Sequence, residues 1–101
     1  MKKLIENIQL RWRLWYVCRK LGIKPHEFQR QYALYGHCRW PDGRRNGKSM
    51  AVQLWGLIRN VETLEGARSL AGRDPDSWRT AVMREVFARE YMVLLQIVKE
   101  G

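Results

Sequence analysis

The chain has 101 residues, of which 46% are hydrophobic and 29% charged, and its formal net charge is +9. This length predicts one domain, residues 1–101, with one modest core, and the hydrophobic content excludes a disordered tail. The apolar stretches are too short and too interrupted by charges to span a bilayer. We therefore expect a cytoplasmic protein with reduced cysteines and no membrane partner.

Positive charge is concentrated in the first half of the chain. Residues 1–50 hold twelve Lys and Arg against three Asp and Glu, a net charge of +9, whereas residues 51–101 hold seven of each and are neutral. Such asymmetry within one domain favours a face that binds a polyanion, nucleic acid above all. The simpler interpretation is a solvated surface that only keeps the protein soluble.

Two helices are predicted before residue 37. Residues 2–21 carry apolar side chains at helical spacing, and Gly22 is a good C-terminal stop. One apolar row is aliphatic: Leu10, Leu14, Val17 and Leu21. The other, which we call the aromatic row, also carries Trp and Tyr: Leu4, Ile5, Ile8, Trp12, Trp15 and Tyr16. A second helix is expected over 25–36, with Pro25 in its first turn.

A basic, glycine-containing loop over 37–48 comes next, and Ser49 is expected to cap a third helix. This helix should break near Asn60, and a short fourth helix should cover 61–71.

Asp74-Pro75 predicts the start of a last helix over 75–99. Residues 91–98 of that helix are apolar nearly all round, which predicts burial in the core or against a second copy in a homo-oligomer. The sequence thus predicts an all-α fold, a compact single-domain bundle of about four to five helices.

The basic loop is the first candidate site. It contains Arg39, Trp40, Arg44, Arg45 and Lys48, and residues 43–49 read Gly-Arg-Arg-Asn-Gly-Lys-Ser. Backbone amides and cations ahead of a helix suit a phosphate. Only three residues separate the glycines, where a P-loop has four, so we reject nucleotide hydrolysis. The alternative is an exposed loop without a ligand.

The corner around Gly22 is the second candidate. A helix-turn-helix would present polar and basic residues of its second helix to a DNA groove: Lys24, His26, Gln29, Arg30 and Gln31. Short helix–Gly–helix junctions are common in helical proteins, so an ordinary corner is the favoured interpretation. The basic residues of this corner, Lys20, Lys24 and Arg30, remain candidate phosphate contacts.

Aromatic residues alternate with arginines in the first helix. Exposed rings in such a setting stack on unpaired bases. Because Trp12, Trp15 and Tyr16 share a face with Ile5 and Ile8, we expect that face in the core instead. Arg11 and Arg13 then point elsewhere as the ligand contacts, and Trp40 is the better stacking candidate.

Residue types and spacings do not indicate catalysis or metal binding. His26 and His37 have no carboxylate or nucleophile partner by spacing, and His37-Cys38 with Cys18 does not match zinc-ligand spacing. We expect no enzymatic activity, no cofactor and no metal.

The leading hypothesis is a small, basic, non-enzymatic protein that binds DNA or RNA through phosphates. The expected contacts are Arg11, Arg13, Lys20, Lys24, Arg30, Arg39, Trp40, Arg44, Arg45 and Lys48. The alternative is a protein-interaction module, such as a phage-type inhibitor or an adaptor, that docks on an acidic, nucleic-acid-handling host protein. A third interpretation places the first helix on a membrane surface. In size and composition the chain resembles small helical accessory proteins of bacteria, phages and plasmids.

Overall fold

The fold of the described residues is built from helices alone, as the sequence predicts. The computed structural model describes the backbone of residues 2–41 and 47–100, and the side chains from residue 8 onward within these ranges. The helices are α1 (Lys2–Leu21), α2 (Glu27–Tyr35), α3 (Lys48–Leu57), α4 (Leu64–Ala71) and α5 (Ala81–Glu100).

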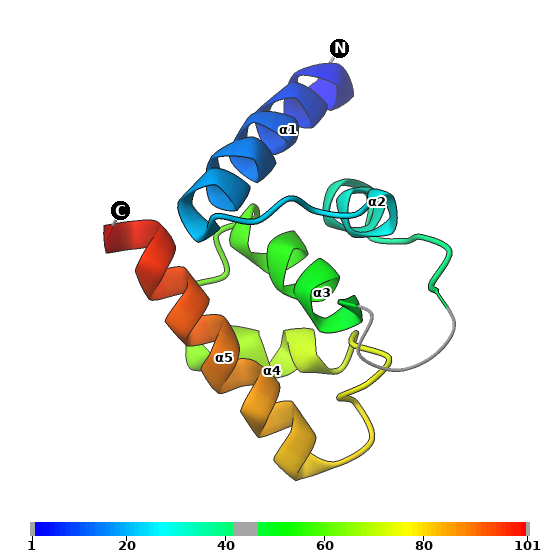
Figure 1. Ribbon diagram of the computed structural model, residues 1–101, viewed down its shortest axis with the longest axis vertical. Coiled ribbons are helices and arrows are strands. Elements are labelled where there is room, and N and C mark those ends of the chain that lie inside the picture. Colours follow the sequence, from blue (N-terminus) through cyan, green and yellow to red (C-terminus); the bar gives the residue numbers. More distant parts are fainter. Residues whose placement is uncertain (1, 42–46, 101) are drawn as a thin grey trace.

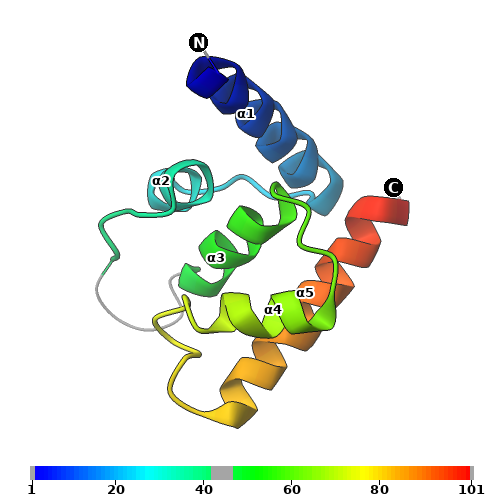
Figure 2. The ribbon, with the colours of Figure 1, turned by 180° about the vertical axis from the view of Figure 1, so that it is seen from behind.

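The helices pack around α3, which lies at the centre of the molecule (Figure 1). α2 packs chiefly on α3, α4 packs chiefly on α5, and α1 contacts α2 and α5 at one end of the fold. Seen from behind, α4 lies in front of α5, and the first turns of α1 project beyond the other helices (Figure 2). The radius of gyration of 13.0 Å is the value for a compact domain of this length.

The aliphatic row of α1 faces the core. Leu14 and Val17 are buried, and Leu10 and Leu21 pack against the core from its edge. Arg13 adds a polar contact, because its guanidinium donates a hydrogen bond to the carbonyl of Ile58 just after α3. α1 ends where expected, since Gly22 adopts a left-handed conformation.

From Ile8 onward the aromatic row of α1 is exposed, and the prediction that these side chains lie in the core is wrong. Trp12 is 62% exposed, Trp15 56% and Tyr16 37%. A helix on the edge of a small core buries only one side. Here the aliphatic row fills the space beside α2 and α3, which leaves the bulky rings in solvent.

α2 starts two residues later than expected, so Pro25 precedes the helix and is not in its first turn. His26 is the N-cap, and its backbone N–H donates to Gln29 Oε1 at 2.7 Å. Gln29 is buried and its amide donates to the carbonyl of Gly47 at 2.9 Å. It therefore links α2 to the start of α3. A residue that reads DNA bases faces solvent, and Gln29 does not.

α3 has Gly47 as its N-cap, and the prediction that Ser49 caps it is wrong. The Ser49 hydroxyl donates instead to Asp74. The predicted break is confirmed at Asn60, which has a positive φ of 60°. α4 begins at Leu64, later than expected, because Thr63 is its cap and accepts a hydrogen bond from the Gly66 N–H at 3.0 Å.

Gly56 is required by the packing of α3 on its neighbours. A Cβ at this position would overlap the Leu70 side chain of α4 and lie 3.1 Å from the Tyr91 ring of α5. Its cost to helix propensity is therefore offset by the close approach of three helices.

α5 begins at Ala81, so the predicted start at residue 75 is wrong. Asp74 is fully buried and organises a turn: its carboxylate accepts hydrogen bonds from the Asp76 N–H and the Ser77 hydroxyl. Thr80 then stands before the helix, and its hydroxyl oxygen accepts from the Met83 N–H at 3.1 Å. An Asp side chain accepts backbone N–H hydrogen bonds in a turn as readily as at the start of a helix. The residue type at position 74 therefore did not distinguish a turn from a helix start.

Only one side of α5 is buried over 91–98. Tyr91 and Leu95 are in the core, and the Tyr91 hydroxyl donates to the carbonyl of Val61 at 2.5 Å. Burial raises the pKa of Tyr91 far above its ordinary value. Val93 and Ile97 are exposed, so the expectation of burial all round is wrong for a single copy of the chain.

Candidate nucleic-acid interface

A basic cleft separates α1 from α2. Its volume is about 440 Å³. Its lining combines charged residues of both helices with an apolar floor: Arg11, Leu14, Trp15, Cys18, Arg19, Ile23, Lys24, Pro25, Arg30 and Leu34. Four of these residues are basic, and among the described residues no acidic side chain lines the cleft. We call this site the basic cleft.

The positions of the basic residues along the chain explain why they meet in the cleft. Arg11, Trp15 and Arg19 recur every four residues and so follow one side of α1. Arg30 lies on α2, and Lys24 lies in the segment that joins the two helices. All four basic side chains are exposed, which leaves their charges accessible to a ligand.

The orientation of the cleft wall is fixed by side-chain contacts. Arg11 Nη2 donates to the Tyr35 hydroxyl at 3.0 Å, a link between α1 and α2. The Arg19 guanidinium lies 5.4 Å from the centroid of the Trp15 ring, within the range of a cation–π contact. On the cleft floor, burial raises the pKa of the Cys18 thiol, an effect that the positive charge of Arg30 partly offsets.

Three of the predicted site residues, Arg11, Lys24 and Arg30, meet in the cleft. Arg19 joins them and was missed, although its spacing from Arg11 and Trp15 placed it on the same side of α1. Lys20 lies just outside, with its ammonium 5.4 Å from the centroid of the Tyr16 ring.

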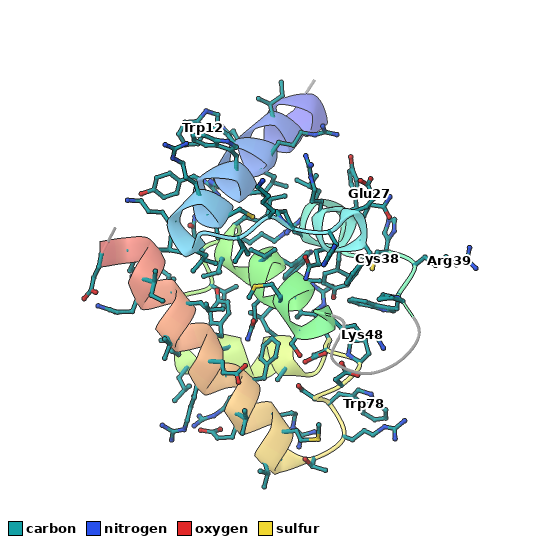
Figure 3. The ribbon with its side chains drawn as sticks, viewed as in Figure 1. Trp12, Glu27, Cys38, Arg39, Lys48 and Trp78 are labelled. Carbon is teal, nitrogen blue, oxygen red and sulfur yellow. The ribbon has the colours of Figure 1, made fainter. Side chains whose placement is uncertain are left out.

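The remaining predicted site residues lie elsewhere. Arg13 Nη1 is engaged with the backbone of Ile58. The Lys48 side chain is only 11% exposed, and its ammonium lies 3.9 Å from the Asp76 carboxylate, so its charge is partly neutralised within the fold. Arg39 points into solvent, beside Glu27 in a separate, shallow depression (Figure 3). Arg44 and Arg45 lie outside the described residues.

Trp40 is not the exposed stacking platform that the sequence suggested. Its ring centroid lies 4.9 Å from that of Tyr32 and 6.2 Å from that of Phe28, and it packs against the core. Trp40 lies against the core because its ring packs on the aromatic side chains of α2. The exposed indoles next to the basic cleft are therefore those of α1.

The described part of the structure shows no cluster suited to metal binding. Within 2–41 and 47–100, no group of three or more His, Cys, Asp and Glu side chains is arranged to hold a metal ion. Cys18 and Cys38 are free thiols. None of the described helices is both long enough and apolar enough to cross a membrane. That the protein is not an enzyme stays a prediction.

Comparison of the chain with protein-family models, curated proteins and solved structures finds no match.

Proposed function

We propose that this protein binds nucleic acid, and that the basic cleft between α1 and α2 contacts its phosphate backbone. The observation that carries the proposal is the lining of the cleft, where Arg11, Arg19, Lys24 and Arg30 converge with no acidic residue among the described lining. Cations that lie close together repel one another, and a bound polyanion removes this repulsion. Binding also releases the counterions of the polyanion, which adds to its affinity.

The distribution of charge supports a long polyanion over a single small anion. The first half of the chain carries the whole net charge of +9. Lys20 on α1 and the exposed Arg39 after α2 place further positive charges outside the cleft. A chain of phosphates matches such an extended surface, and an isolated phosphate does not. The 42–46 segment, with Arg44 and Arg45, is proposed as a further contact.

Neutralising the cleft should weaken binding to every nucleic-acid sequence. For the wild-type protein, log affinity should fall with log salt by about 0.9 per phosphate contacted on duplex DNA. In Arg19→Ala/Lys24→Ala/Arg30→Ala, the slope should become shallower by about two to three units, since each lost contact removes roughly one. Fluorescence anisotropy titrations at several salt concentrations measure both quantities.

The matched control removes the same charge from the opposite end of the molecule. Arg79→Ala/Arg84→Ala/Arg89→Ala changes the turn before α5 and the first half of that helix, which point away from α1 (Figure 1). This variant should keep the wild-type slope. Equal effects of the two triple variants would mean that net charge alone acts, and an affinity that does not change with salt would contradict phosphate binding.

A second candidate function is a protein-interaction module, and the outer face of α5 favours it. Four apolar side chains that recur along this face are exposed: Val82, Val86, Val93 and Ile97. An apolar row of this kind is typical of a helix that packs on a partner, either a second copy or a host protein. The basic cleft would then attract an acidic partner by charge.

The two functions respond differently to one pair of substitutions. Val86→Glu/Val93→Glu should leave nucleic-acid affinity unchanged under the first proposal. Under the second, the same variant should lose a stoichiometric partner that wild-type protein captures from nuclease-treated lysate. Sedimentation of the purified protein shows whether that partner is a second copy of the chain.

A further inference from the structure

The exposed side of α1 carries a continuous aromatic surface next to the basic cleft. We define this aromatic face by Ile8, Trp12, Trp15 and Tyr16, all of which are exposed. Trp12 points away from the other helices into solvent (Figure 3). Large aromatic side chains bury the most apolar area of any residue when they meet a partner, so an exposed pair of indoles on one helix is a surface for binding.

The rings of this face contact one another. The centroids of Trp12 and Trp15 lie 5.8 Å apart in an edge-to-face arrangement. Trp12 and Tyr16 lie 6.1 Å apart with an interplanar angle of 18°. Mutual packing limits the rotation of the indoles, so less conformational entropy is lost when a flat ligand stacks on them.

Trp15 links the aromatic face to the basic cleft, because it belongs to both. Arg19 lies over one side of the Trp15 ring, at 5.4 Å from its centroid. A ligand bound here therefore meets cations and an aromatic ring together. Alternating phosphates and flat bases are the chemistry that this pairing suits.

We propose that the nucleic acid is single-stranded, with phosphates in the basic cleft and unpaired bases stacked on Trp12 and Trp15. This inference rests on the proposed function. In a duplex the base faces are stacked on one another and closed to an indole, whereas a single strand exposes them. Arg19 and Trp15 lie side by side on α1, as adjacent phosphate and base contacts require.

The test compares one labelled strand in two forms, an oligothymidylate alone and the same strand annealed to its complement. Wild-type protein should bind the single strand at least about tenfold more tightly, since stacking of one base contributes roughly a fivefold to 150-fold gain. Trp12→Ala alone, which leaves the basic cleft intact, should keep duplex affinity within about twofold of wild type, and Trp12→Ala/Trp15→Ala should lose the single-strand preference. Trp12→Phe/Trp15→Phe should keep most of it, because a ring face remains.

Trp78 provides the matched control. It is 51% exposed and has Arg79 5.7 Å from its ring centroid, yet it lies at the other end of the molecule (Figure 3). Trp78→Ala should therefore bind both forms as wild type does. Far-ultraviolet circular dichroism should show equal helix content in all variants, because the substituted rings are exposed.

Each further outcome has one meaning. If neither form of the strand binds, the proposed function fails. If both bind equally and Trp12→Ala/Trp15→Ala changes neither, the single-strand inference is wrong and the proposed function stands. If that variant loses binding to phosphatidylglycerol vesicles but not to the oligothymidylate, the aromatic face is a membrane contact and the inference is overturned.

Discussion

Replacing Asp74 with alanine should lower the free energy of unfolding by roughly 3 kcal/mol or more, because one buried and two partly buried donors lose their shared acceptor. Asp74 is fully buried, and its carboxylate accepts from the hydroxyls of Ser49 and Ser77 and from the backbone N–H of Asp76. These bonds connect the start of α3 to the turn before α5. Urea unfolding followed by circular dichroism measures the loss.

Two further variants show whether the acceptor itself matters. Asp74→Asn keeps the shape and one acceptor oxygen, so its stability should lie between wild type and Asp74→Ala. Asp76→Ala removes a neighbouring carboxylate that lies 3.9 Å from the Lys48 ammonium but is more exposed, and it should cost no more than about 1 kcal/mol. An Asp74→Ala protein as stable as wild type would show that the hydrogen-bonded turn does not stabilise the fold.

Shortening Leu95 to alanine should cost roughly 2–5 kcal/mol, since the side chain is buried where α5 meets the core and its removal leaves a cavity. Leu94 is only partly buried against the same core, so Leu94→Ala should cost less. Ile97→Ala should change stability by no more than about 0.5 kcal/mol because Ile97 is exposed.

The order of these three costs tests the rotation of α5 about its axis. Thermal or urea unfolding of the three variants should rank Leu95→Ala as the most damaging and Ile97→Ala as the least. A large cost for Ile97→Ala that depends on protein concentration would instead show that the outer face is buried in an oligomer.

The basic cleft and the aromatic face give the proposed function two separable parts. Cations supply affinity that falls with salt, and the indoles supply selection for exposed bases. Trp15 belongs to both surfaces, so its replacement alone should lower both the salt-dependent affinity and the preference for a single strand. Replacement of Trp12 should lower only the preference for a single strand.

The sequence by itself determined the helical class, the approximate position of each helix and the concentration of positive charge before residue 51. Apolar spacing, Gly22 and the break at Asn60 carried that information, because helix periodicity and chain reversal depend on local residues. The aliphatic row of α1 was also readable as a core face.

The tertiary structure alone decided which apolar row of α1 meets the core and which Lys and Arg side chains line one cleft. Periodicity shows that Trp12 and Trp15 share a face, but the choice between two apolar faces depends on the surface that α2 and α3 offer. The same holds for Asp74, whose side chain could cap a helix or close a turn, and whose burial beside Ser49 selected the turn. Arg19, Lys24 and Arg30 line one cleft only because α2 packs beside α1.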